Sequence, residues 1–212
     1  MTTEQAQPIE VVFFDFSGVL ADEGFVNGLR KIAVRNGFDP DEFQHIATEI
    51  CYEGGYATGT ATEVEFWEEV RKKTGLVEQT ELLHLEIMTG FDVRLWMLEV
   101  VDVIRASGVK TAILSDHTNW LESLDFEHSI YSHFDRVFNS FREGISKRSH
   151  DYFHHALRAM DVVPERALFV DDNPSNLLRA TDIGMQTLLY DEHDKVLKQL
   201  QELFPDLIFP AI

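Results

Sequence analysis

Short, continuously apolar runs alternate with longer amphipathic segments along the second half of the chain. The apolar runs are predicted to be buried strands because they are short and rich in β-branched and aromatic residues, and they span 110–115, 136–139, 167–171 and 186–190. The segments between and after them are predicted to be helices, at 119–127, 149–160, 173–183 and 193–204. This alternation predicts an α/β fold with a parallel sheet and helices on both faces.

The first part of the chain contains one predicted strand followed by a long helical region. Residues 10–15 form a continuously apolar run that ends at Asp15, and Gly18 permits a tight turn after it. From about residue 24 to about residue 89, apolar residues recur at helical intervals, and glycines interrupt the pattern. Four helices without an intervening strand are typical of a small bundle.

These patterns divide the chain into two predicted domains. We expect an α/β core domain made of residues 8–22 and 90–212, and a four-helix cap domain inserted as residues 23–89. A further predicted helix begins near Asp92 and leads back into the core. The C-terminal segment 204–212 is apolar and contains two prolines, so we expect it to pack on the core or at a contact surface.

The charge of the chain excludes one class of partner and constrains another. With 18 basic and 37 acidic residues the formal net charge is −19, so binding to nucleic acid through a basic face is not expected. An acidic protein also repels anionic substrates, so a phosphate site here needs a cation or a local basic group.

The remaining bulk features favour a cytoplasmic protein, and the oligomeric state stays open between a monomer and a homodimer. Cys51 is the single cysteine, so no intrachain disulfide is possible, and its helical context predicts a buried position. Residues 1–10 lack the apolar centre of a signal peptide, and no apolar run is long enough to span a bilayer, so no membrane partner is expected.

Polar and acidic residues follow three of the predicted strands at the point where each strand ends. Asp15 ends the first strand, Ser115 and Asp116 end the second, and Asp171 and Asp172 end the strand at 167–171. The carboxyl ends of parallel strands lie on one edge of the sheet, where ligands of open α/β sheets bind. We therefore expect these side chains to meet at one site.

The carboxylates at this edge predict a divalent cation. Asp15 can act as a nucleophile or bind a cation, although aspartate is also a common turn residue. Asp171 and Asp172 would repel each other and raise each other's pKa unless a cation lay among them, and Mg²⁺ prefers such oxygen ligands. The hypothesis requires Asp172 to lie near Asp15, with no lysine or arginine in the place of the ion.

Other residues in this order predict phosphate binding. The Ser115 hydroxyl, the following Asp116 and the nearby backbone amides can hold substrate oxygens. Lys147, just before the helix at 149–160, can neutralise a phosphate or the nucleophilic aspartate, although alone it would be read as a surface lysine. Asn176 can orient one of the acidic side chains or the lysine.

Taken together, these segments resemble the motifs of the haloacid dehalogenase-like hydrolase superfamily, in the branch with a small helical cap. Residues 15–20 are similar to its first motif, Ser115 to the second, Lys147 to the third and residues 171–176 to the fourth. The resemblance covers nearly the whole chain and implies a Rossmann-like core. Segments 56–67 and 144–157 are similar to sugar-phosphate phosphatases of the glucose-1-phosphatase-like type.

The resemblance implies a two-step, Mg²⁺-dependent hydrolysis of a small phosphorylated metabolite. Asp15 would attack phosphorus and form an aspartyl-phosphate, which water would then hydrolyse. Mg²⁺ would be held by Asp15, the main-chain carbonyl of Ser17 and Asp172, with Asp171 contributing directly or through water. Ser115 and Lys147 would bind the phosphoryl oxygens.

Two positions depart from the family pattern. Many family phosphatases have a second aspartate, the general acid and base, where this chain has Ser17, and loss of such help costs a factor of about 10²–10⁴. Arg148 stands where the family usually has proline, and we expect it to lie in solvent. Substrates with good leaving groups would be affected least by the absence of the acid.

Two alternatives remain beside the phosphatase hypothesis. One is the dehalogenase chemistry that gives the superfamily its name, in which the aspartate attacks carbon without a metal; the pair Asp171–Asp172 argues against it. The other is a catalytically weakened member with a binding or regulatory role, which Ser17 keeps open. The sequence does not identify the substrate, although the cap residues 52–59 are expected to select it.

Overall fold

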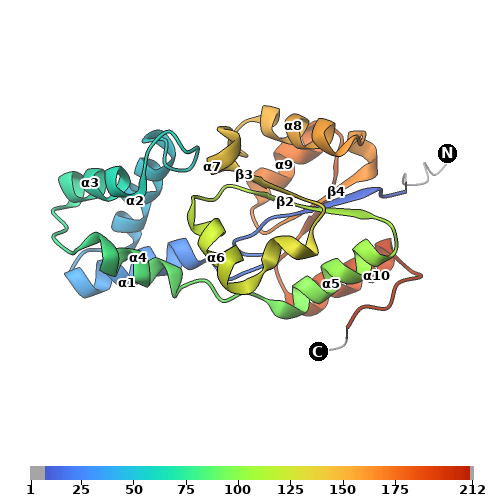
Figure 1. Ribbon diagram of the computed structural model, residues 1–212, viewed down its shortest axis with the longest axis horizontal. Coiled ribbons are helices and arrows are strands. Elements are labelled where there is room, and N and C mark those ends of the chain that lie inside the picture. The colour runs from blue at the N-terminus through green and yellow to red at the C-terminus, as the bar shows by residue number, and fades with distance from the viewer. Residues whose placement is uncertain (1–7, 211–212) are drawn as a thin grey trace.

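The computed structural model describes residues 8–210 and contains one five-stranded parallel sheet at its centre (Figure 1). The strand order is β3-β2-β1-β4-β5, so β1 lies in the middle. The strands are β1 (Val11–Phe14), β2 (Lys110–Ser115), β3 (Arg136–Asn139), β4 (Ala167–Asp171) and β5 (Gln186–Leu189). The prediction of a Rossmann-like α/β fold with a parallel sheet is confirmed.

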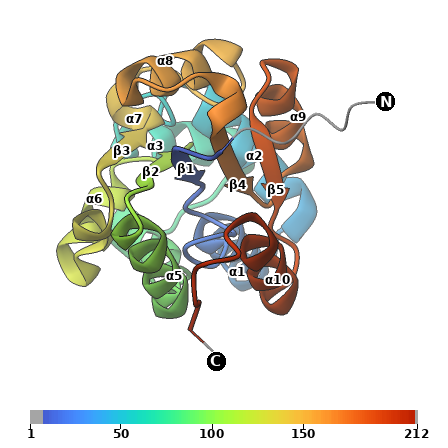
Figure 2. The same cartoon turned by 90° about the vertical axis from the view of Figure 1, so that its right-hand side faces the viewer.

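Helices cover both faces of the sheet, as the end-on view shows (Figure 2). One face carries α8 (His150–Met160) and α9 (Pro174–Asp182), and the other carries α5 (Leu95–Ala106) and α10 (His193–Leu203). Successive strand side chains point to opposite faces, and both faces are covered, which explains why every residue of β1 is buried.

The two faces of the central strand belong to different parts of the core. Val12 and Phe14 pack into the cluster that contains α5 and α10, whereas Val11 and Phe13 pack into the cluster that contains α8 and α9. The continuous apolar run that identified this strand in the sequence therefore reflects burial on both sides.

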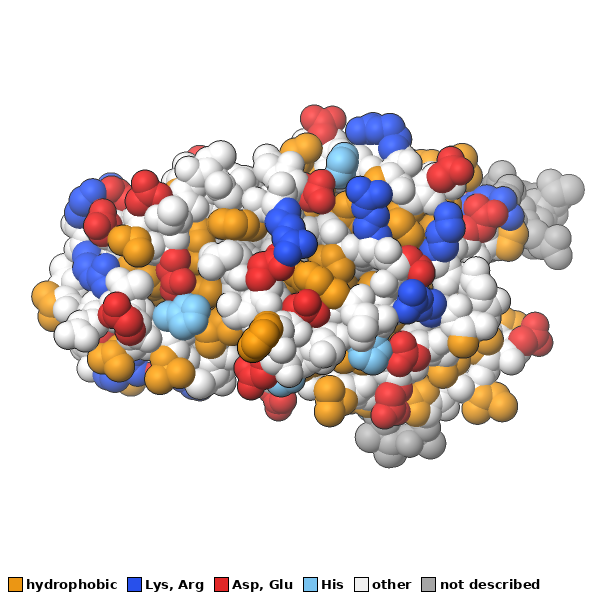
Figure 3. Space-filling view, viewed as in Figure 1, with side chains coloured by type: hydrophobic (Ala, Val, Ile, Leu, Met, Phe, Trp, Pro, Cys, Tyr) orange, Lys and Arg blue, Asp and Glu red, His pale blue; other side chains and the backbone are white. Residues whose placement is uncertain are grey.

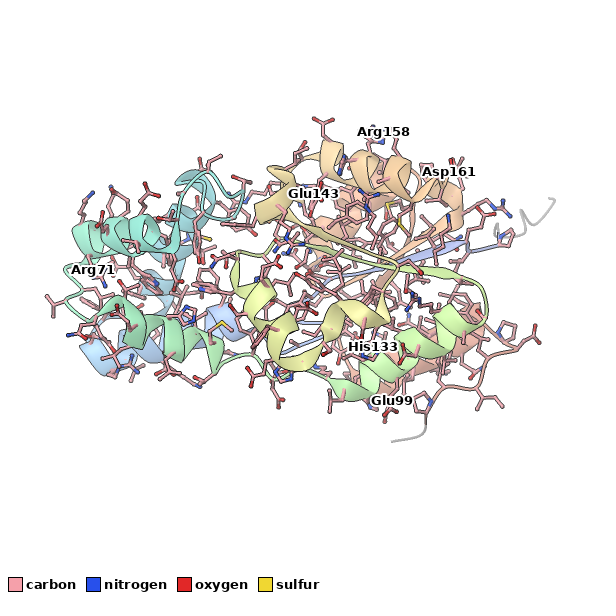
Figure 4. The ribbon with its side chains drawn as sticks, in the orientation of Figure 1. Arg71, Glu99, His133, Glu143, Arg158 and Asp161 are labelled. Carbon is pink, nitrogen blue, oxygen red and sulfur yellow. The ribbon has the colours of Figure 1, made fainter. Side chains whose placement is uncertain are left out.

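Of the five helices between β1 and β2, the first four gather at one end of the molecule, on the left in Figure 1. They are α1 (Gly24–Asn36), α2 (Pro40–Glu53), α3 (Glu63–Thr74) and α4 (Thr80–Met88), and we call them the helical insertion. Asp39 caps α2, and Thr62 and Glu65 form a capping box at the start of α3, which matches the sequence signals. Arg71, labelled in Figure 4, joins α3 to α4 by donating to the Glu78 carbonyl and the Thr80 hydroxyl.

Several short elements escaped the sequence prediction. They are η1 (Ile130–His133), α7 (Ser140–Glu143) and η2 (Pro164–Arg166). They follow α6 (Trp120–His128), which corresponds to the helix predicted at 119–127. Segments of three or four residues carry too few apolar positions to show a period. The predicted packing of the C-terminal segment is confirmed for Phe204, Leu207 and Phe209, which contact the core.

The surface carries both signs of charge. On the face in Figure 3, acidic and basic side chains are interspersed and form no continuous basic area. Among residues 8–210, no helix is long and apolar enough to cross a membrane. Cys51 is buried, as its helical context predicted.

Candidate active site

Sheet register brings Asp15 and Asp171 side by side. Phe14 pairs with Val170, and the Asp15 amide continues the ladder by donating to the Val170 carbonyl over 2.9 Å. Asp15 therefore follows β1 at the level where Asp171 ends β4. The expected meeting of strand ends at one edge is observed for these two carboxylates.

Lys147 bridges these carboxylates from the segment before α8. Its Nζ lies 2.8 Å from Asp15 Oδ2 and 2.8 Å from Asp171 Oδ2, and its side chain is 2% exposed. Burial would lower the pKa of Lys147, but the two carboxylates outweigh that effect and raise the pKa above its ordinary value. Lys147 is therefore a buried cation and not the surface lysine that it would suggest in isolation.

Asp171 is held in place by hydrogen bonds from several neighbouring groups of the protein. It accepts hydrogen bonds from the Asn173 amide over 2.7 Å and from Asn176 Nδ2 over 3.1 Å, in addition to Lys147. Asn176 thus orients an acidic side chain, one of the two roles that its position in the sequence indicated. Asp171 is fully buried, and its bonds suit a residue that anchors Lys147.

Asp172 approaches the turn that follows Asp15. A Cβ atom at Gly18 would lie 2.1 Å from Asp172 Oδ2, so only glycine leaves room for this carboxylate, and the φ of +82° also favours glycine. Oxygen atoms of Asp15, Asp171 and Asp172 lie within 4.8 Å of one another. Among the described residues, no lysine or arginine forms an ion pair with Asp172.

This donor set fits a hard divalent cation. Carboxylate oxygens suit Mg²⁺, and Asp15 and Asp172 both line the same cavity as Ser17. Lys147 Nζ contacts Asp15 and Asp171 but makes no ion pair with Asp172, so the lysine does not substitute for a cation beside Asp172. The requirement that Asp172 lie near Asp15 is met.

The acidic side chains have raised pKa values, which is expected where buried carboxylates outnumber the cations near them. Burial raises the pKa of Asp15 well above its ordinary value, and Lys147 opposes that shift only in part. Burial and the neighbouring Asp171 raise the pKa of Asp172. Burial and Asp172 raise the pKa of Glu23 to about 7. A bound cation would favour the ionised form of each.

Ser115 and Asp116 occupy different environments at the end of β2. Ser115 is fully buried, contributes to lowering the pKa of Asp15 and does not line the cavity. Asp116 lines the cavity, and it accepts from the Lys147 amide over 2.7 Å and from the Tyr52 hydroxyl over 3.2 Å. Asp116 therefore connects the helical insertion with the backbone of Lys147, and substrate binding by either residue stays a prediction.

The helical insertion and the sheet edge enclose one cavity of about 420 Å³. Besides the acidic residues and Lys147, its walls contain side chains from α1, α2 and the segment after β2, including Phe25, Gln44, Tyr52, His117 and Trp120. A cavity of this size suits a small organic ligand. Tyr52 belongs to the segment expected to select the substrate.

Sequence reasoning missed Glu23 and His117 as members of this site. Glu23 follows no strand and directly precedes α1, and His117 lies two residues past the end of β2. Their membership depends on how the helical insertion docks on the sheet edge. The nearest signal in the sequence was the position of His117 just after a predicted strand end.

Arg148 is exposed, as expected, but its side chain also contacts the helical insertion. Its guanidinium lies 3.7 Å from the centre of the Tyr52 ring. It also pairs with Glu49 at 3.2 Å and Glu53 at 3.4 Å, while its side chain stays 42% exposed. Arg148 thus fastens α2 to the segment that carries Lys147.

A parallel α/β core with acidic strand ends and a buried lysine defines a class of hydrolases, and the family comparison agrees. Residues 9–184 match the model of the haloacid dehalogenase-like hydrolase family. The chain therefore belongs to the haloacid dehalogenase-like hydrolases, as the motif resemblance indicated.

Two curated relatives illustrate the range of proteins that carry this region. Acyl-CoA dehydrogenase family member 10 of Mus musculus is 32% identical over 107 residues, which cover 50% of this chain and 10% of the relative. Bifunctional epoxide hydrolase 2 of Sus scrofa is 25% identical over 220 residues, which cover 92% of this chain and 39% of the relative. The chain thus spans less than half the length of either relative.

Solved structures share the fold. A HAD family enzyme of Bacteroides thetaiotaomicron superposes with a TM-score of 0.75 at 17% identity, covering 93% of this chain and 99% of that enzyme. A structure of the same enzyme in complex with magnesium and inorganic phosphate has a TM-score of 0.70 at 16% identity, covering 86% of this chain and 94% of that chain. At this identity the likeness shows a common fold.

Proposed function

We propose that this chain is a Mg²⁺-dependent phosphatase of small phosphorylated metabolites of the sugar-phosphate type. The observation that carries the proposal is the grouping of Asp15, Asp171 and Asp172 beside the buried ammonium of Lys147. Phosphoryl transfer requires alignment and charge neutralisation. This grouping provides a nucleophile in Asp15, a fixed positive charge in Lys147 and carboxylate oxygens that can bind Mg²⁺. The magnesium and phosphate complex of the enzyme with the same fold supports the choice of metal.

Asp15 is the proposed nucleophile. The Phe16 amide donates to its Oδ1 over 2.7 Å and Lys147 Nζ lies 2.8 Å from its Oδ2, so both oxygens are oriented. A carboxylate oxygen attacks phosphorus while the bond to the leaving-group oxygen breaks, which forms an aspartyl-phosphate. Water then attacks phosphorus, the acyl-phosphate P–O bond breaks, and orthophosphate and the Asp15 carboxylate are released.

The remaining groups of the site hold charge and enclose the substrate. Lys147 neutralises phosphoryl oxygens together with Asp15, and Asp171 keeps its ammonium in position. Asp15, Asp172 and the Ser17 carbonyl would hold Mg²⁺, which supplies positive charge to the transferring phosphoryl group when bound. The helical insertion acts as a cap that encloses the substrate.

The test is release of phosphate from p-nitrophenyl phosphate with Mg²⁺ and with EDTA. We expect turnover that requires the metal and that falls by at least about 10³-fold in Asp15→Asn, because the nucleophile is lost. Asp182→Asn is the matched control, since Asp182 is a half-exposed acid that lies 3.6 Å from His150, outside the site. Equal activity of wild type and Asp15→Asn would contradict the assignment of the nucleophile.

Ser17 supports one alternative, a weakened member with a binding or regulatory role. Serine is a poor acid near neutral pH, so a leaving group that needs a proton receives little help from it. The absence of turnover across a broad panel of metabolite phosphates would favour this alternative. Halide release without a metal would instead favour the dehalogenase, which the carboxylates of Asp171 and Asp172 near the nucleophile oppose.

A further inference from the structure

With the acids ionised, as a bound cation favours, the walls of the cavity carry far more negative than positive charge. The carboxylates that line it belong to Asp15, Glu23, Asp116 and Asp172. Among the described residues that line the cavity, Lys147 is the one lysine or arginine. A divalent cation at Asp15 and Asp172 would offset this charge only in part, and the phosphate group of a substrate would itself add negative charge.

The cavity has no positive charge to spare for a second anionic group. Lys147 is already paired with Asp15 and Asp171 at 2.8 Å each. His117 is the other side chain in the walls that can become cationic, and burial lowers its pKa to about 4, so it is neutral at physiological pH. Arg148, although close to Tyr52, is paired with two glutamates of α2.

The part of the wall formed by the helical insertion is uncharged, and Glu23 lies just before its first helix. Gln44 and Thr48 of α2 offer neutral amide and hydroxyl groups, while Phe25 and Tyr52 offer aromatic surface. Trp120 contributes a third aromatic side chain from the core. Such walls suit hydroxyl groups and apolar ring faces, which need no counter-ion.

We infer that the site selects phosphate monoesters whose leaving group carries no negative charge, such as a polyol or a neutral sugar, and rejects carboxylated analogues of the same size. This inference rests on the proposed phosphatase function. A carboxylate on the leaving group would have to leave water and lie among acids with no cation available to pair with it. Discrimination therefore comes from repulsion and lost hydration, and not from the volume of the cavity.

A matched pair of esters tests the inference. Glycerol 3-phosphate and 3-phosphoglycerate differ in a terminal CH₂OH against a carboxylate and are nearly equal in size. With the wild-type chain and Mg²⁺, we expect kcat/KM to be at least about ten-fold higher for glycerol 3-phosphate. A ratio near one, or a preference for 3-phosphoglycerate, would overturn the inference and leave the phosphatase function standing.

Loss of the proposed function has a different signature. In that case phosphate would be released from none of the three esters, glycerol 3-phosphate, 3-phosphoglycerate and p-nitrophenyl phosphate. Both the inference and the proposed function would then be contradicted. The two failures are therefore distinguishable in one set of assays.

A charge placed in the cavity wall provides a second test. Gln44→Lys adds an ammonium to the half-buried wall of α2, so we expect it to narrow the ratio between the two esters by raising activity on 3-phosphoglycerate. His45→Lys is the matched control, since His45 is the next residue of the same helix, is exposed and does not line the cavity. Equal effects of the two variants would show that net charge and not the cavity wall sets the ratio, which would overturn the inference.

Discussion

Replacement of Lys147 by methionine is the most direct test of the charge arrangement in this site. Methionine keeps an unbranched side chain in a position that is 2% exposed and removes the ammonium. Asp15 and Asp171 then face each other without the cation that lies 2.8 Å from each of them. Removing one partner of a buried ion pair costs about 3–5 kcal/mol, because the other charge stays buried and unpaired.

The size of this loss should depend on pH, and its sign follows from the pKa of Asp15. Burial holds that pKa well above its ordinary value in the folded state, even with Lys147 present. A group with a raised folded-state pKa contributes stability that is present at low pH and is lost as pH rises through the folded pKa. Because a protonated Asp15 needs no cation, Lys147→Met should destabilise the chain more at pH 8 than at pH 5.

The measurement is denaturant-induced unfolding in EDTA, followed by circular dichroism at both pH values. We expect the free energy of unfolding at pH 8 to fall by about 3–5 kcal/mol in Lys147→Met. Lys195→Met is the control, since Lys195 of α10 pairs at the exposed surface with Asp191, which precedes the helix, so its loss should leave the free energy of unfolding nearly unchanged. A loss in Lys147→Met that is under about 1 kcal/mol, or equal at both pH values, would refute the reasoning.

Three further substitutions test separate parts of the site. Ser17→Asp should raise kcat/KM by about 10²-fold or more for alkyl phosphates but less for p-nitrophenyl phosphate, because only poor leaving groups need the acid; equal gains would contradict this. Gly18→Ala should abolish the rise in melting temperature caused by Mg²⁺, since the added Cβ atom would lie 2.1 Å from Asp172 Oδ2. An unchanged rise would show that this turn does not contribute to metal binding. Arg148→Ala should speed amide hydrogen exchange in α2, because Arg148 contacts that helix. Arg142→Ala should not, because the ion pair with Glu122 and the ring contact with Tyr131 that it removes do not involve α2.

The sheet could be predicted from the sequence because its central strands are buried on both faces. A strand such as Ala167–Asp171 shows this burial as an unbroken apolar run, and its polar end marks the edge of the sheet. Parallel pairing then leaves little freedom in where Asp15 and Asp171 lie relative to each other. This is why the acidic part of the site could be located from strand ends.

The rest of the site depends on contacts between segments that are distant in the sequence. Arg148 and Tyr52 are 96 residues apart, and nothing near Arg148 in the sequence shows that an aromatic ring will lie 3.7 Å from its guanidinium. Glu23, the residue before α1, likewise belongs to the site because it lies close to Asp172. Such side chains carry no local pattern, so the docking of the helical insertion had to be known before they could be assigned.

The same docking explains how the helical insertion can influence chemistry at a sheet edge that it does not form. Tyr52 of α2 donates to Asp116, and the other oxygen of Asp116 accepts from the Lys147 amide, whose side chain holds Asp15. Movement of α2 away from the sheet would therefore remove a donor from a buried carboxylate and loosen the backbone of Lys147, which pairs with Asp15. Because Arg148 directly follows Lys147 and pairs with the same helix, the docking of the insertion and the position of the Lys147 ammonium are joined through adjacent residues of one segment.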